Sequence, residues 1–261
     1  MSRLHRILAV GVAVCAFALV AVAERPGTGA MAQQTVAPFT EIEFTLPGEL
    51  TLLRGESPRV GITAEPQQLE AIEVIVDDGL LIIRADERGW LRRVALDDVK
   101  VEVSYQALNA LRIAGSGDAL GDAFASDAFE LSVSGSGSAL LQSLSCKTAS
   151  FGVAGSGDIG IQALDATSST TEISGSGDIV LRGTVAEQVL RIAGSGDYRA
   201  GGLISQSALL NIAGSGSARL QASERISGSI LGSGDLLYVG EPELAIRVEG
   251  SGEVKQLPQT L

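Results

Sequence analysis

Apolar and polar residues alternate along most of this chain, and the alternation is organised around a repeated tripeptide. Gly-Ser-Gly occurs eight times, with spacings of 20, 20, 20, 19, 20, 18 and 18 residues. Two residues before each tripeptide stands a β-branched apolar residue, and the residue before that one is mostly polar. This alternation predicts a strand entering every tripeptide. The β-branched residues are Ile113, Val133, Val153, Ile173, Ile192, Ile212, Ile230 and Val248.

Each period reads as a strand, a Gly-Ser-Gly corner, a second strand and a looser stretch. Twenty extended residues trace about 66 Å, which fits one circuit of a three-sided coil better than a hairpin of two long strands. Glycine supplies the positive φ that a recurring corner requires, and a small Ser lets coils approach closely while its hydroxyl bonds along the stack. An antiparallel meander or propeller is the alternative, but propeller blades need about 40 residues and aromatic signatures. We predict an all-β fold, a right-handed parallel β-helix (solenoid) of roughly 20-residue coils.

Residues 36–110 lack the tripeptide but keep the alternation. Asp77-Asp78-Gly79 predicts a hairpin turn between strands at 71–76 and 80–84. An open solenoid end exposes strand edges, so we expect this region to be a β-rich cap. A separate small sandwich is the alternative. The expected organisation is a signal peptide at 1–23, a linker at 24–37, the cap or first coils at 38–110, the repeat solenoid at 111–254 and a tail at 255–261.

The N-terminus has the pattern of a secretory signal. Arg3 and Arg6 precede an uncharged apolar stretch at 7–23, which ends in small residues suited to cleavage after Ala23. A second candidate cleavage site follows Ala32, and an uncleaved membrane anchor is the alternative. We therefore expect a chain exported across the inner membrane, to the periplasm or the cell surface.

Cleavage would remove His5 and Cys15 and leave Cys146 as the only cysteine. No disulfide, zinc site or Ser-His-Asp triad is then expected. A net charge of −12 disfavours nucleic acid and anionic lipid as partners. A polysaccharide-active enzyme is a weaker hypothesis, because the carboxylates are repeated and aromatic residues make up only 4%. We predict a protein that is not an enzyme and has no cofactor.

The residue after each tripeptide is usually acidic, so stacked coils would form a carboxylate ladder. Such a ladder suggests weak Ca²⁺ sites at Asp158, Asp178 and Asp197. The favoured interpretation is that each carboxylate accepts hydrogen bonds from nearby backbone N–H groups, since Ser interrupts the ladder twice. The eight positions are Asp118, Ser138, Asp158, Asp178, Asp197, Ser217, Asp235 and Glu253.

The order of these features resembles the head GIN domain family of auto-transporter adhesins. The resemblance rests on Phe39-Thr40-Glu41-Ile42, on 48–55, on 74–84 with its Asp-Asp-Gly turn, and on the serial Ile-Ala-Gly-Ser-Gly-Asp units. It covers roughly residues 38–254 and implies a β-helical fold and a location in the cell envelope. This chain departs from a true auto-transporter, because its C-terminal stretch is too short for a translocating membrane barrel.

The resulting hypothesis is an exported protein that presents a rigid surface for binding or adhesion to a protein or glycan ligand, in the envelope or outside the cell. A structural or stress-related periplasmic protein is the alternative. The sequence predicts no oligomeric state.

Overall fold

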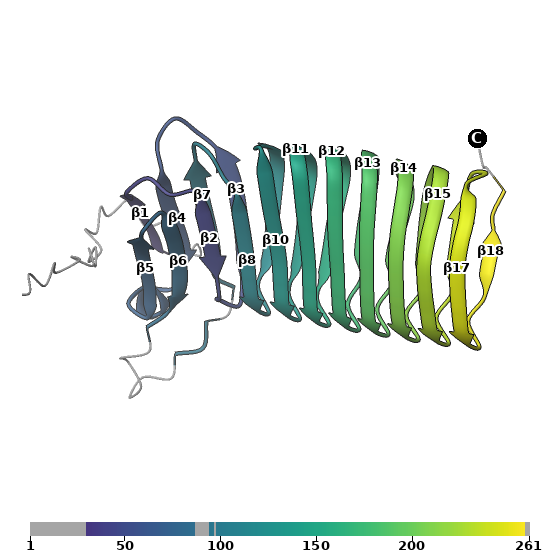
Figure 1. Ribbon diagram of the computed structural model, residues 1–261. Helices are drawn as coiled ribbons and strands as arrows, with labels where there is room; N and C mark the ends of the chain where they lie inside the picture. The colour runs from purple at the N-terminus through teal and green to yellow at the C-terminus, as the bar shows by residue number, and fades with distance from the viewer. Residues whose placement is uncertain (1–29, 87–93, 97, 259–261) are drawn as a thin grey trace, which may run out of the picture.

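The computed structural model of the chain describes residues 30–86, 94–96 and 98–258, so the predicted signal peptide lies outside it. These residues form one 18-stranded sheet wound into a solenoid of about seven turns, with a four-residue helix (Figure 1). The predicted all-β parallel solenoid is confirmed. The elements are β1 (Ala30–Thr35), β2 (Glu41–Phe44), β3 (Glu49–Arg54), β4 (Arg59–Ala64), α1 (Pro66–Leu69), β5 (Ile72–Asp77), β6 (Leu80–Ala85), β7 (Lys100–Tyr105), β8 (Ala110–Gly115), β9 (Asp118–Ala125), β10 (Ala128–Gly135), β11 (Ser138–Gly155), β12 (Asp158–Gly175), β13 (Ile179–Gly194), β14 (Tyr198–Gly214), β15 (Ala218–Gly232), β16 (Leu236–Val239), β17 (Glu243–Gly250) and β18 (Val254–Gln256).

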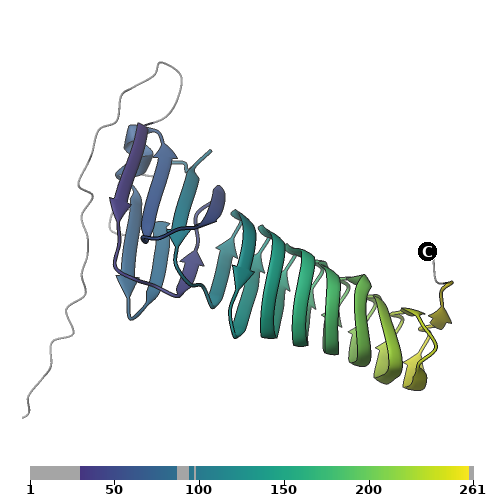
Figure 2. The same cartoon turned by 90° about the horizontal axis from the view of Figure 1, so that it is seen from above.

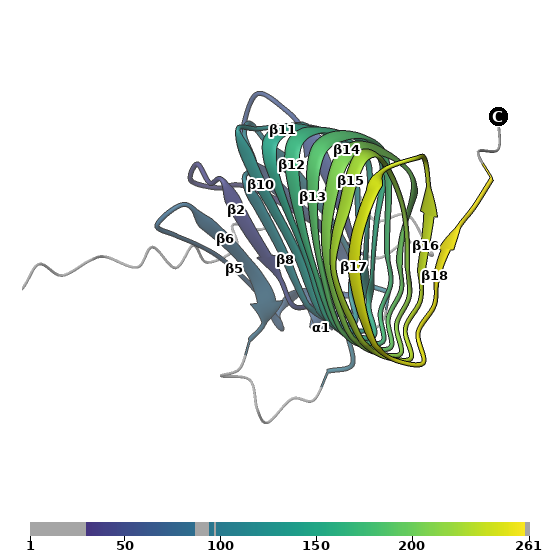
Figure 3. The ribbon, with the colours of Figure 1, turned by 45° about the vertical axis from the view of Figure 1, so that its right-hand side comes forward.

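Each coil of the repeat region has three straight sides. The pairing of β11 with β12 runs over 138–141, 143–146 and 148–155, and it is interrupted at Gln142 and Lys147. These two bends and the Gly-Ser-Gly corner separate the three sides of each coil. Figure 3 shows the successive coils stacked in parallel, from β10 to β17.

The β-branched residue before each tripeptide points into the solenoid and stacks on its counterpart in the next coil. Val133 pairs in register with both Ile113 and Val153, and the same register continues to the last coil. These side chains are buried as far as Ile230, whereas Val248 in the final coil is 38% exposed. The predicted internal ladder is therefore present, and it ends at an uncovered coil.

The Gly-Ser-Gly corners are joined by backbone hydrogen bonds. The carbonyl oxygen of Gly115 accepts hydrogen bonds from the backbone N–H of Ser136 at 2.9 Å and of Gly137 at 3.1 Å, and every later corner repeats this pattern. We expected the Ser hydroxyl to bond along the stack; in the described corners the backbone N–H does so instead. Glycine is needed because Gly135 has a φ of +129° and a Cβ there would overlap the carbonyl oxygen of Gly115.

A coil without the tripeptide precedes the repeat region. β2 pairs in parallel with β8, and β3 pairs in parallel with β9, so residues 41–54 make a first coil. Its corner is Thr45–Gly48, and the carbonyl oxygen of Gly48 accepts a hydrogen bond from Asp118 N at 2.8 Å. The ring of Phe44 occupies the core position over Ile113.

The cap lies on the outer side of this first coil (Figure 2). β6 and β7 pair in parallel with β2 and β3, and β5 and β4 then pair antiparallel with β6 and β7. The cap thus continues the solenoid walls rather than forming a separate sandwich. The predicted hairpin turn is present, with positive φ at Asp78 and Gly79. The short helix α1 contributes buried Leu69.

β1 corrects the expected linker at 24–37. Residues 30–35 pair antiparallel with β4, with Ala32 opposite Ile62, and Ala32 is buried in the core. The sequence did not reveal this strand, because its inward positions carry only Ala30, Ala32 and Gln34, which are small or polar. Cleavage after Ala32 would remove half of β1. No helix among the described residues is long and apolar enough to cross a membrane.

Candidate functional site

The predicted carboxylate ladder is present, and its members bond to the backbone of the next coil. Oδ1 of Asp158 accepts a hydrogen bond from Asp178 N at 2.8 Å. Oδ1 of Asp178 accepts one from Asp197 N at 2.9 Å, and Oδ1 of Asp197 accepts one from Ser217 N at 3.0 Å. Each carboxylate therefore tethers the start of the following coil.

The guanidinium group of Arg199 contacts two carboxylates of this ladder. Its Nη2 lies 2.9 Å from Oδ2 of Asp178 and 3.3 Å from Oδ2 of Asp197. The sequence analysis missed this contact, although Arg199 follows Asp197 by two residues and so lies on the same strand face. Among residues 30–86, 94–96 and 98–258, no group of three or more His, Cys, Asp or Glu side chains is arranged to hold a metal.

We expect Asp178→Ala to lower the free energy of unfolding by about 1 kcal/mol, because it removes a hydrogen bond to the backbone N–H of Asp197 and a solvent-screened ion pair with Arg199. Ser217→Ala is the matched control, since Ser217 occupies the same corner position with no side-chain hydrogen bond among the described residues. Urea unfolding followed by circular dichroism measures both. The midpoints should be the same in Ca²⁺ and in chelator; a calcium-dependent rise that Asp178→Ala abolishes would establish a cation site.

Cys146 is held in an unreactive state. It lies partly buried on β11, paired in register with Ala166. Burial, together with the nearby carboxylate of Asp165, raises the pKa of the Cys146 thiol to about 11. Only the thiolate is nucleophilic, so this environment disfavours chemistry at the sulfur.

The folded protein should consequently react with a thiol-specific disulfide reagent at pH 8 at least about ten times more slowly than the urea-unfolded chain, given its smaller thiolate fraction. A Ser134→Cys change on the exposed outer face, in a Cys146→Ser background, provides the accessible control. Equal rates for folded and unfolded Cys146 would contradict this assignment.

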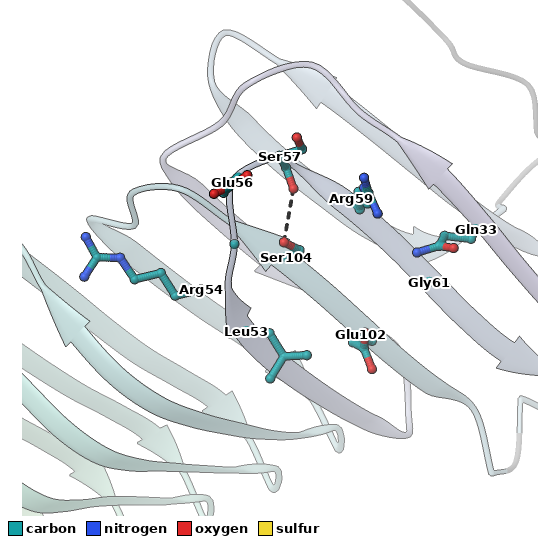
Figure 4. Close-up of a pocket in the computed structure, with 10 residues that line it drawn as sticks. Gln33, Leu53, Arg54, Glu56, Ser57, Arg59, Gly61, Glu102 and Ser104 are labelled. Carbon is teal, nitrogen blue, oxygen red and sulfur yellow. Dashed lines mark hydrogen bonds between the residues drawn. The ribbon is translucent and has the colours of Figure 1, made fainter.

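The candidate binding site is a surface pocket on the cap, with a volume of about 400 Å³ (Figure 4). It lies where β1, β4 and β7 run beside the end of β3. Gly61 on β4 leaves room at its base, since a Cβ there would still be 3.9 Å from its nearest neighbours. The pocket is lined by Gln33, Leu53, Arg54, Gly55, Glu56, Ser57, Arg59, Gly61, Glu102 and Ser104.

The loop that forms one wall of the pocket is tied by three hydrogen bonds to β7 and to Gln106, the residue directly after it. Ser104 Oγ donates to the carbonyl oxygen of Ser57 at 3.1 Å, and Gln106 Nε2 donates to that of Glu56 at 2.6 Å. The backbone N–H of Gly55 donates to the carbonyl oxygen of Tyr105 at 2.9 Å. The wall is therefore fixed before any ligand arrives, which lowers the entropy cost of binding.

The pocket carries both signs of charge. Arg54 and Arg59 are exposed and, in the part of the chain that the structure describes, form no ion pair with a carboxylate. Glu56 and Glu102 are exposed on the same lining. These groups, with two hydroxyls and an amide nearby, suit a polar ligand that also bears charges. The sequence analysis missed this site, because its residues come from three stretches of the chain (residue 33, residues 53–61 and residues 102–104) that only the cap brings together.

Solved structures share this fold over nearly their whole length. A protein from Parabacteroides distasonis described as a "putative lipid binding protein" is 23% identical, with a TM-score of 0.83 over 89% of this chain and 98% of that one. A "putative adhesin" from Parabacteroides merdae is 19% identical, with a TM-score of 0.82 over 89% of this chain and 98% of that one. A "putative adhesin" from Parabacteroides distasonis is 21% identical, with a TM-score of 0.76 over 88% and 98%.

At these identities the likeness shows the fold alone. A search of curated proteins gave no match. The family model described as "Putative auto-transporter adhesin, head GIN domain" matches residues 38–242, which include the cap except β1, the pocket lining except Gln33, and all but the last coil. The resemblance seen in the sequence is thereby confirmed, and the chain belongs to the head GIN domain family.

Proposed function

We propose that this chain is an exported, non-enzymatic binding module that uses the cap pocket to hold a partner in the cell envelope or outside the cell. The observation that carries the proposal is the preformed pocket wall, which is tied to β7 and carries charged side chains that form no ion pair with any described residue. The solenoid behind it acts as a rigid stalk, since its core is continuous from the cap to β16. The adhesin description of the family agrees with this role.

A protein segment fits the pocket better than a glycan. Arg54 and Arg59 can each receive a carboxylate, and Glu56 and Glu102 can each receive a cationic side chain. Leu53, which is 36% exposed, adds an apolar contact at the edge. Sugar sites commonly use aromatic platforms, whereas no aromatic side chain lines this pocket.

Protease accessibility of the epitope-tagged protein on intact cells tests the location. Degradation on intact cells is expected if the module meets partners outside the cell. Protection until the outer membrane is permeabilised would restrict partners to the periplasm. Protection combined with no binding to isolated envelopes would instead support a structural or stress-related periplasmic protein.

Retention of the labelled, purified protein on envelopes of the producing cells tests the pocket. Arg59→Glu should reduce retention at least about tenfold, because it places a third carboxylate where an acidic partner group would bind. Arg219→Glu makes the same charge change on the solenoid face, far from the cap, and should leave retention unchanged. Equal loss in both variants would indicate non-specific electrostatics and overturn the assignment.

A further inference from the structure

The C-terminal end of the solenoid is open. β17 pairs with β15 along one edge, and no strand pairs with its other edge among the described residues. Leu244 and Val248 stack on Ile226 and Ile230, which are fully buried, yet they are 42% and 38% exposed themselves. The end thus presents both unpaired backbone groups and uncovered core side chains, which is a template for strand pairing.

The N-terminal end does not offer a matching surface. Its outermost strands, β1 and β5, have buried inward residues such as Ala32, Ile72 and Val74. The antiparallel turns of the cap and α1 close that end of the core. Head-to-tail stacking of copies would therefore place the open C-terminal end of one copy against the covered N-terminal end of the next. A symmetric contact between two C-terminal ends joins two open coils instead, and it closes without forming a fibre.

We propose that a second copy of this chain covers the open end, with the two β17 strands pairing antiparallel about a two-fold axis through Ala245. In this register Glu243 of one copy lies opposite Arg247 of the other, and the contact occurs twice by symmetry. Both residues are exposed on the outer face of β17. Within its own copy, Glu243 lies 3.4 Å from Arg225 and Arg247 lies 2.6 Å from Glu249. Antiparallel partners directly opposite one another have neighbouring side chains, so the two inter-copy pairs would extend these ion pairs across the junction.

The same register joins the two cores. Leu244 of each copy lies opposite Ile246 of the other on the inward face, so the apolar ladder continues across the junction. The neighbouring registers do not pair both the opposite charges and the apolar residues in this way. A shift that centres the axis on Ile246 sets Glu243 against Glu249, and one that centres it on Arg247 sets that charge against itself. An axis through Val248 also sets Arg247 against Glu249, but it leaves Ile246 opposite Gly250 and Leu244 opposite Gly252. Charge and apolar pairing together therefore select the axis through Ala245.

Site-specific cross-linking of the full mature chain tests this arrangement. An antiparallel pair places its Cα atoms about 4.5 or 5.5 Å apart, and both distances suit a disulfide. In a Cys146→Ser background, Ala245→Cys should form a covalent dimer under mild oxidation. Ser227→Cys is the matched control, because Ser227 lies on the same face one coil further in and is in register with Ala245. It should remain monomeric in denaturing gels.

Light scattering after size-exclusion chromatography gives the second readout. The unmodified chain should have twice the monomer mass at about 100 μM, and Val248→Asp, which places a charge on the open core, should have the monomer mass with an unchanged circular dichroism spectrum. A monomeric unmodified chain, or equal cross-linking of the two cysteine variants, would overturn the proposal. So would a dimer that Ala245→Cys fails to cross-link. This proposal does not depend on the function assigned to the cap pocket.

Discussion

Replacing Gly177 with Ala should lower the free energy of unfolding by about 3–5 kcal/mol, which is the range of severe single substitutions. Gly177 is the second glycine of a central corner and is buried against the preceding coil. An added Cβ would overlap the carbonyl oxygen of Gly157 and also approach Val153 Cγ1 at 2.8 Å. The clash is with backbone that the coil stacking holds in place, so no side-chain movement relieves it.

Gly152→Ala is the matched control, because its added Cβ meets only Ser132 Cβ, at 3.9 Å. Gly152 lies within a strand of the same coil stack, on the outward face, so this change should leave stability within about 0.5 kcal/mol. Urea unfolding of the two variants distinguishes a steric requirement of the corner from a general intolerance of alanine. Similar losses for both would contradict the stacking account.

Tyr198→Phe should lower the free energy of unfolding by about 1–3 kcal/mol, the cost of leaving a buried hydrogen-bonding group unpaired. The Tyr198 hydroxyl donates to Gln188 Oε1 at 2.9 Å inside the solenoid. Gln188 Nε2 in turn donates to Ser205 Oγ at 2.7 Å, and Ser205 Oγ donates to the carbonyl oxygen of Gln221 at 2.6 Å. Removing the hydroxyl leaves the Gln188 oxygen without its donor in an apolar core.

Tyr238→Phe provides the control for this change. Tyr238 is also buried, but its hydroxyl forms no hydrogen bond in the part of the chain that the structure describes. The two substitutions remove the same atom, so their difference in unfolding midpoint isolates the buried network. A destabilisation by Tyr238→Phe as large as that by Tyr198→Phe would show that the network contributes little.

The repeat region was predictable because its signal is periodic. Each coil repeats the same requirements, namely a β-branched residue in the core and two glycines at the corner, so chance composition cannot imitate it. The first coil lacks that signal. Phe44 fills the core there, and Pro47 and Gly48 shape the corner in place of Gly-Ser-Gly, so only the parallel pairing with β8 and β9 reveals it.

The pocket and the internal polar network were not predictable, for a related reason. Arg54, Arg59 and Glu102 line the same pocket only because β7 returns between β3 and β4 after the hairpin of β5 and β6. Gln188 occupies a position that reads as an ordinary polar residue, and its burial depends on Tyr198 and Ser205 in the following coil. Such contacts depend on long-range pairing, which local alternation does not encode.

Because its corners are identical and stacked, the length of this molecule depends on the number of its coils. Each coil contacts the coil before it and the coil after it, so one more coil could be inserted without changing the chemistry of either end. An added coil of about twenty residues would move the cap pocket about 4.8 Å further from the open C-terminal end. The number of coils would therefore determine the distance between the cap pocket and the C-terminal end, independently of what the cap binds. Related chains could differ in this distance while keeping the same cap and the same open end.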